Sequence, residues 1–279
     1  MRSVTVELSR FGGLATRTQL RAVGCSARAL RRHVANGLAI PVRRSWLAAT
    51  GADPAAVRAV QLGGILGGSS ALRSFGVWVS HDDGLCVAAP PGSSHLPALA
   101  QGEYRLFPHD FTWPTGIRWR TDVVSALLQL APRADVGDWI ASVDSALHIG
   151  AMAASQLGEL FSRLPRRFRR LRRLIEPRSE SGIETLLRVA AVLEGWDVEV
   201  QVTISRVGTV DLLINGWLVI ETDSDRWHSS PQQRAKDRAR DAELVRQGKR
   251  SHRFGYSQIM GDLDGCLDVI RALLAAGRP

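Results

Sequence analysis

Hydrophobic and polar positions repeat most regularly in the last third of the chain. Apolar residues spaced for one helical face predict three helices there, at 181–194, 232–247 and 262–275. Short runs rich in valine, leucine and isoleucine predict four strands, at 197–205, 209–214, 217–223 and 250–254. The order helix, three strands, helix, strand, helix predicts a small mixed sheet with helices on both faces.

The first 50 residues predict two short helices and a hairpin. Thr16 can cap the first helix and Ser26 the second, which ends at the Asn36-Gly37 pair. Arginines fall on the polar side of the second helix and at the hairpin tip: Arg28, Arg31, Arg32, Arg43 and Arg44. This order is typical of a winged helix-turn-helix that binds DNA. The alternative is a small helical domain whose arginines are simply solvated.

The middle of the chain, residues 51–160, predicts a mixed α+β region that carries no catalytic cluster. A helix is expected over 55–68 and a short strand over 116–121. His81-Asp82-Asp83 resembles a metal motif, but the glycine that follows favours a polar turn.

An arginine-dense helix is predicted next, at 161–178. Its apolar positions form one stripe: Leu164, Phe168, Leu171 and Leu174. The other positions include Arg166, Arg167, Arg170 and Arg173. Such a helix suits a phosphate backbone, and it suits an exposed connector between domains equally well.

Charge and cysteine content add to this picture. The 36 Lys and Arg residues outnumber the 27 Asp and Glu residues, which gives a formal charge of +9 and favours a polyanionic partner such as DNA. Nearly all the cations are arginine, a bias that a GC-rich genome also produces. The three widely spaced cysteines argue against a disulfide framework or a zinc knuckle. The N-terminus is charged and no apolar run reaches membrane length, so a cytoplasmic protein is expected.

Acidic side chains interrupt the apolar strands of the last third. Asp211 precedes Leu-Leu-Ile on one strand, while Glu221 and Asp223 end the next strand. Carboxylates in such places are costly unless something pairs them, and oxygen ligands select Mg²⁺ or Mn²⁺. Such an ion can activate water for phosphodiester hydrolysis. His228 is a candidate general acid or base near neutral pH.

The turn between these two strands decides whether the carboxylates meet. A two-residue turn at Asn215-Gly216 places Asp211 opposite Ile220, and Glu221 then faces the other way. A three-residue turn, Ile214 to Gly216, places Asp211 on the face of Glu221 and Asp223. A shared metal site therefore requires the odd-length turn.

Glu184, near the start of the preceding helix, has two interpretations. It can bind the metal through water. It can also complete a capping box with Ser181, which the spacing Ser-x-x-Glu favours.

These motifs resemble, in order, those of a bacterial endonuclease-domain family related to very-short-patch repair endonucleases. The family pattern is Ser-x-x-Glu on a helix, then Val-Asp, then Glu-x-Asp-Gly-x-x-x-His, then an Arg-Asp-rich helix and an Arg-Phe strand. The corresponding segments here are Ser181–Glu184, Val210-Asp211, Glu221–Ser224, His228, Arg240-Asp241 and Arg253-Phe254. The resemblance covers roughly the last 100 residues.

The resemblance implies a PD-(D/E)xK-like, restriction-endonuclease-like fold at 179–279, with Asp211 as the central metal ligand. It also places Thr222 and His228 at site positions. Two departures stand out: Asp223 occupies the place of the superfamily's lysine, and Ser224 that of the usual glycine. Residues 1–50 resemble, less specifically, the winged-helix head of abortive-infection antitoxins.

The expected protein is therefore a mixed α/β chain with a winged head at 1–50, a middle region at 51–160, a connecting helix at 161–178 and a nuclease domain. The leading hypothesis is a Mg²⁺- or Mn²⁺-dependent DNA endonuclease in repair or defence, with Glu184, Asp211, Glu221, Asp223 and His228 at its centre. Two alternatives remain open. One is a DNA-binding regulator or antitoxin with a degenerate nuclease domain, and the other is a scaffold for an acidic partner.

Overall fold

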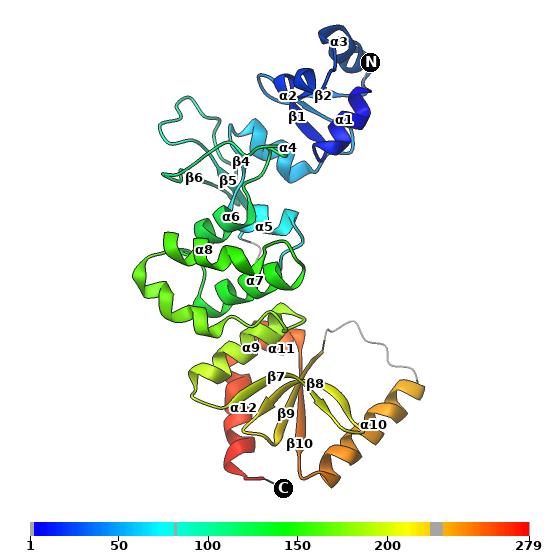
Figure 1. Cartoon of the computed structure of the whole chain (residues 1–279), viewed down its shortest axis with the longest axis vertical. Helices are drawn as coiled ribbons and strands as arrows, with labels where there is room; N and C mark the ends of the chain where they lie inside the picture. Colours follow the sequence, from blue (N-terminus) through cyan, green and yellow to red (C-terminus); the bar gives the residue numbers. More distant parts are fainter. Residues whose placement is uncertain (1–2, 81–82, 224–230, 279) are drawn as a thin grey trace. The chain divides into compact units, whose positions relative to one another are not determined.

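The computed structural model describes residues 3–80, 83–223 and 231–278, and this part of the chain is mixed α+β with three small sheets (Figure 1). Two compact units divide it. The first comprises residues 1–76 and 81–133, and the second comprises residues 77–80 and 134–279. Each unit has a hydrophobic core of its own and is described separately.

The first unit begins with a helix, a strand, two helices and a hairpin. The elements are α1 (Val4–Arg10), β1 (Leu14–Thr16), α2 (Arg17–Ala22), α3 (Ala27–Ala35), β2 (Ile40–Pro41) and β3 (Trp46–Ala48). Both predicted caps are confirmed, because Thr16 Oγ1 accepts from the Gln19 amide and Ser26 Oγ from the Ala29 amide, each at 3.1 Å. The sequence did not predict α1 or β1, and β1 pairs with β3 in the order β1-β3-β2.

The rest of the first unit is a three-stranded sheet with short helices. Its elements are α4 (Pro54–Gln61), β4 (Ile65–Leu66), α5 (Gly68–Ser74), β5 (Leu85–Ala88), β6 (Glu103–Leu106) and α6 (Val123–Leu130). The helix predicted over 55–68 is wrong in its second half, because Gly63 adopts a φ of 87° and ends it before β4. The strand predicted over 116–121 is reduced to a single bridge between Leu66 and Arg120.

After residues 77–80, the second unit continues with helices that pack on one another. They are α7 (Val136–His148), the short 3₁₀ turn η1 (Ala154–Gln156), α8 (Leu157–Arg163) and the 3₁₀ helix η2 (Arg166–Leu174). The single arginine-rich helix predicted over 161–178 is therefore wrong. Pro165 excludes the α conformation from the residue before it, and Leu164 accordingly has a ψ of 150°.

Residues 166–174 repeat the pattern Arg-Arg-apolar three times, and a 3₁₀ helix has three residues per turn. Every apolar residue therefore falls on one side, and Phe168, Leu171 and Leu174 are all buried. Trp139 of α7 packs against Phe168 with ring centroids 5.7 Å apart. The match between sequence period and helix type explains a 3₁₀ helix of unusual length.

The C-terminal elements follow the predicted order. They are α9 (Gly182–Leu193), β7 (Val198–Ile204), β8 (Gly208–Ile214), β9 (Leu218–Asp223), α10 (Pro231–Arg246), β10 (Arg250–Gly255), α11 (Tyr256–Gly261) and α12 (Leu263–Ala275). The sheet order is β10-β9-β8-β7, antiparallel except for the parallel pair β9 and β10, which α10 connects. Only the short helix α11 was not predicted.

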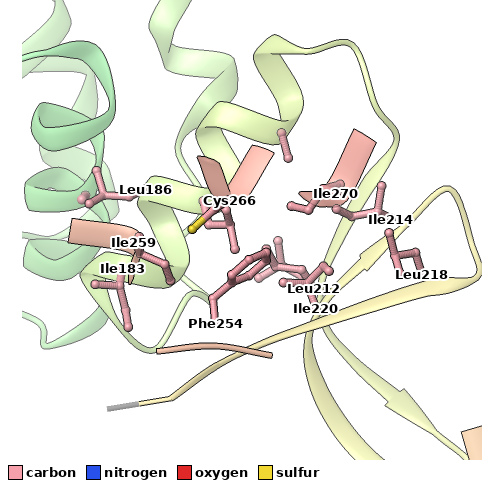
Figure 2. Packing of buried hydrophobic residues seen from close by; sticks show 14 residues of the cluster. Ile183, Leu186, Leu212, Ile214, Leu218, Ile220, Phe254, Ile259, Cys266 and Ile270 are labelled. Atoms are coloured by element: carbon pink, nitrogen blue, oxygen red, sulfur yellow. The ribbon is translucent and has the colours of Figure 1, made fainter. Parts of the chain in front are cut away.

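Helices cover both faces of this sheet (Figure 1). On one face, residues of α9, α11 and α12 pack on the strands, and Phe254 of β10 lies in the same cluster as Ile259 and Cys266 (Figure 2). On the other face, Leu244 of α10 packs against a second cluster that contains Val210, Leu213 and Val219. The predicted two-sided packing is confirmed.

A buried ion pair joins α7 to α9. Arg188 Nη2 lies 2.8 Å from Asp144 Oδ2 and also donates to the Leu174 carbonyl at 2.7 Å. The Thr185 hydroxyl and the Glu176 amide donate to the same carboxylate. Burial nevertheless raises the pKa of Asp144 to about 6. These bonds fasten α7 and the end of η2 to the helix that precedes the sheet.

In the parts of the chain that the structure describes, no helix has the length and apolar character needed to cross a membrane.

Candidate active site

The turn between β8 and β9 has an odd number of residues. Ile214 pairs with Leu218 and Leu212 with Ile220, which leaves Asn215, Gly216 and Trp217 in the turn. Asn215 and Gly216 adopt φ values of 50° and 74°. The turn lies one residue further along the chain than predicted, but its parity is the one that the site requires. The regular pairing of the two strands ends at Leu212 and Ile220, immediately beside Asp211 and Glu221.

The sheet is irregular at Asp211. On β7 and β8, the pair Val200–Leu212 packs in the cluster beneath α9, whereas Val202 and Val210 pack in the cluster beneath α10. Positions two apart normally share a face of a sheet, so both strands reverse their faces between these pairs. The residues at the reversal are Gln201, with a φ of 52°, and Asp211.

Asp211 is held in place by the neighbouring strand. Its Oδ2 atom accepts from the Thr222 amide at 2.8 Å and from the Thr222 hydroxyl at 3.1 Å. Burial raises the pKa of Asp211 despite these bonds, and the nearby negative charges of Glu221 and Glu180 raise it further. Asp211 is therefore a half-buried carboxylate beside other carboxylates.

Glu221 is bound by two arginines. Arg240 of α10 donates to Oε1 at 2.8 Å, and Arg253 of β10 donates to Oε2. Arg253 Nε also lies 3.2 Å from Asp223 Oδ2. A guanidinium therefore stands beside Asp223, the position at which the resemblance leads one to expect a lysine.

Glu184 is buried at the start of α9 with 1% of its surface exposed. Its amide donates to Ser181 Oγ at 3.2 Å, which is one half of the predicted capping box. The other half differs, because its carboxylate accepts from the Glu180 amide at 2.8 Å and from Gln201 Nε2 at 3.1 Å. Glu184 thus caps the helix and also faces the irregular point of the sheet.

Burial raises the pKa of Glu184 to about 7, and the charges of Asp211 and Glu180 contribute to the increase. The ionised Asp211 on β8 therefore opposes the ionisation of Glu184 on α9. A divalent cation between such groups would relieve this repulsion and lower both pKa values. The donor set, carboxylates with a hydroxyl, suits Mg²⁺ or Mn²⁺.

The cluster differs from a preformed metal cage. Among the residues that the structure describes, no group of three or more His, Cys, Asp or Glu side chains is gathered as a metal site. Both oxygens of Glu221 face arginines, so Glu221 can bind an ion only by giving up one of these bonds. The predicted general acid or base, His228, lies outside the described residues.

Gln201, Glu180, Arg240 and Arg253 join the cluster although none was among the predicted site residues. The resemblance had named Arg240 and Arg253 as motif positions without giving them a role. Gln201 carried one local signal, an amide in the middle of the run Val-Glu-Val-Gln-Val-Thr-Ile. Its hydrogen bond with Glu184 depends on the pairing of β7 with β8, which the local pattern does not contain.

The predicted DNA-binding arginines lie in three places. On α3, Arg28, Arg31 and Arg32 are exposed. At the β2–β3 turn, Arg43 and Arg44 line a cavity described below. On η2, six exposed arginines form what we call the arginine ridge: Arg166, Arg167, Arg169, Arg170, Arg172 and Arg173. None of the six makes an ion pair with another described residue, although arginines elsewhere pair with Glu103, Asp144, Glu176 and Glu194.

Comparison with known proteins adds no relative. No protein-family model matches the chain, and no curated protein matches it.

Proposed function

We propose that this protein is a Mg²⁺- or Mn²⁺-dependent DNA endonuclease with its active site at the junction of α9, β7, β8 and β9. The observation that carries the proposal is the meeting of Asp211 with Thr222 and with further carboxylates. Burial raises the pKa of Asp211 and of Glu184; the charge of Glu221 adds to the first shift and the charge of Asp211 to the second. Carboxylates that oppose one another's ionisation at an irregular point of a sheet suit a site that gains a cation.

In this proposal Asp211, Glu221, Thr222 and Glu184 would hold the ion. The ion would supply a Lewis acid that polarises the phosphate and acidifies a water molecule. Thr222 fixes the orientation of Asp211 through its two hydrogen bonds. Arg253 and Arg240 supply positive charge beside Glu221, the role that a lysine has in related folds. The arginine ridge and the exposed arginines of α3 would hold the DNA backbone.

The test is cleavage of plasmid, mismatched and single-stranded DNA with Mn²⁺ or Mg²⁺. Asp211→Asn removes the central carboxylate charge and should reduce cleavage at least about 100-fold, since it acts on transition-state charge. Asp197→Asn is the matched control, because Asp197 is an exposed carboxylate just before β7. Absence of cleavage on all three substrates, or equal cleavage by Asp211→Asn, would reject the proposal.

A second candidate is a DNA-binding regulator with an inactive nuclease domain. It is favoured by the first unit, whose helix, strand, two helices and hairpin follow the order of a winged helix-turn-helix with three exposed arginines on α3. It predicts metal-independent, sequence-specific binding to the promoter of its own gene in a mobility-shift assay. Binding that ignores sequence and disappears with salt would speak against a regulator.

A further inference from the structure

The first unit contains a cavity of about 270 Å³ between the β2–β3 turn and the segment after α4. Its lining includes arginines, tryptophans and a hydroxyl: Arg43, Arg44, Arg118, Trp46, Trp113 and Thr16. The main chain of Gly63 and Gly64 forms another part of the wall. This cavity lies in a different compact unit from the carboxylate cluster and has no part in the proposed hydrolysis.

The arginines of this cavity have no carboxylate partner in the described parts of the chain. Arg43, Arg44 and Arg118 form no ion pair with any carboxylate of residues 3–80, 83–223 or 231–278. A fourth arginine, Arg105, lies near Arg43: burial lowers the pKa of Arg105, the charge of Arg43 lowers it further, and the charge of Glu103 opposes both. The Arg105 Nε atom is buried and has no hydrogen-bond partner among the described residues. Clustered arginines that have no ion-pair partner attract an anion, and concave walls strengthen the attraction.

The local backbone brings these arginines to the cavity. The β2–β3 turn is closed by bonds from the Trp46 amide to the Arg43 carbonyl and from the Val42 amide to the Trp46 carbonyl. Arg44 adopts a φ of 46°, a conformation that is costly for a residue other than glycine. Gly63 admits the Arg43 guanidinium, because a Cβ atom there would lie 1.9 Å from Arg43 Nη1.

The two tryptophans limit the chemistry of the ligand. Trp46 is almost fully buried, while Trp113 has 45% of its surface exposed. Arginines recognise the oxygens of a phosphate, and an exposed indole stacks on the flat face of a base. The volume is near the lower end of small-molecule pockets, so it suits one nucleotide and excludes a duplex.

We infer that this cavity binds a single nucleotide through its phosphate and base, either free or as one residue of a single strand. Arg43 and Arg44 then bind this ligand rather than the duplex that the hairpin pattern predicted as their partner. Arg118 and Trp113, which the sequence did not single out, complete the site.

The test is isothermal titration of the full chain without divalent metal, so that the hydrolytic site has no part in the result. Adenosine 5′-monophosphate should bind saturably, and adenosine, which lacks the phosphate, should bind at least about tenfold more weakly. Arg118→Gln and Arg44→Gln should each weaken binding of the monophosphate about tenfold or more. Arg21→Gln, which changes an exposed arginine of α2 outside the cavity lining, is the matched control and should have no effect.

A 5′-phosphorylated six-residue single strand separates the two sources of the ligand. Tighter binding of the strand indicates a nucleic-acid end or loop, and tighter binding of the monophosphate indicates a free nucleotide. Arg44 is exposed, so Arg44→Gln leaves the core intact even if a change at Arg118 disturbs folding. The inference is overturned if neither probe binds saturably, if adenosine binds as well as its monophosphate, or if Arg44→Gln leaves the affinity of both probes unchanged.

Discussion

Glu184 combines burial, a helix cap and repulsion by Asp211 in one side chain. A glutamate has a pKa near 4.3 in an unfolded chain, whereas burial raises the pKa of Glu184 to about 7 in the fold. A carboxyl group whose pKa is raised by folding stabilises the protein when the pH is below its pKa in the unfolded chain. This stabilisation is lost as the pH rises through its pKa in the folded protein. The metal-free protein should therefore lose stability between about pH 4 and pH 7 through this residue.

The variant Glu184→Gln isolates this effect, because it removes the charge and keeps the shape. At pH 8 it should be more stable than the wild type by up to about 3 kcal/mol, and at pH 4 the two should be nearly equal. Urea unfolding at both pH values measures the difference. Glu199→Gln, at an exposed position of β7, is the control and should show no such pH dependence. A difference of the same size at both pH values would contradict the assignment.

Gln201 has an unfavourable backbone conformation, but its side chain makes a hydrogen bond in the site. Its φ of 52° is unfavourable for glutamine but natural for glycine, while its amide donates to Glu184 at 3.1 Å. Gln201→Gly should therefore gain about 1 kcal/mol of stability over Gln201→Ala, since both lose the amide and only glycine relieves the backbone.

Activity should separate from stability in this pair. Both variants remove the hydrogen bond that lowers the pKa of Glu184, so cleavage should fall in both and its pH profile should shift upward. A merely structural role for Gln201 would instead leave the activity of Gln201→Gly at the wild-type level with an unchanged pH profile.

At the scale of an element, η2 shows how a repeat of three residues produces a surface. Three apolar side chains face α7 and α8, and the arginine ridge is left outside without carboxylate partners among the described residues. Arg167 and Arg172 lie over Phe168 and Phe161, whereas Arg166 and Arg170 make no ring contact in the described structure. Arg166 and Arg170 can therefore be changed with little effect on packing.

The double variant Arg166→Gln/Arg170→Gln should weaken DNA binding without changing the sequence preference. Removing one arginine–phosphate ion pair should reduce the slope of log affinity against log salt by about 1, so a decrease of about 2 is expected. Fluorescence anisotropy over a salt series measures it. Arg178→Gln serves as the control, because Arg178 is already paired with Glu176 at 2.6 Å. An unchanged slope in the double variant would mean that the ridge does not bind DNA.

The helix η2 also shows where the local sequence pattern is not sufficient to predict the structure. The strands and helices after residue 179 are predictable because their apolar spacing is long and regular. In η2 the apolar spacing also suits an α-helix, and Pro165 was the one residue in the sequence that indicated an interruption between α8 and η2. The odd turn parity was one of two alternatives that the sequence allowed. The reversal of faces at Gln201 and Asp211 depends on the pairing of two strands. It therefore cannot be predicted from the sequence of either strand alone.

At the scale of the whole molecule, the two units carry the two proposed sites separately. The carboxylate cluster lies in the second unit and the arginine-lined cavity in the first. Compact units with separate cores commonly unfold in separate transitions, and a ligand raises the transition of the unit that binds it. We therefore expect two transitions in differential scanning calorimetry of the metal-free chain.

Adding a ligand for each site should show which unit gives rise to which unfolding transition. Mn²⁺ at 100 times its dissociation constant should stabilise one transition by about 2.7 kcal/mol, and adenosine 5′-monophosphate at the same excess should stabilise the other equally. At a fixed Mn²⁺ concentration the effect should be larger at pH 8 than at pH 6, because the ion needs Glu184 and Asp211 ionised and their pKa values are raised. Asp211→Asn should abolish the Mn²⁺ effect alone, and Arg44→Gln should reduce the monophosphate effect alone. If both ligands moved the same transition, the two sites would not reside in independently folding units, and the separation of hydrolysis from nucleotide binding would have to be abandoned.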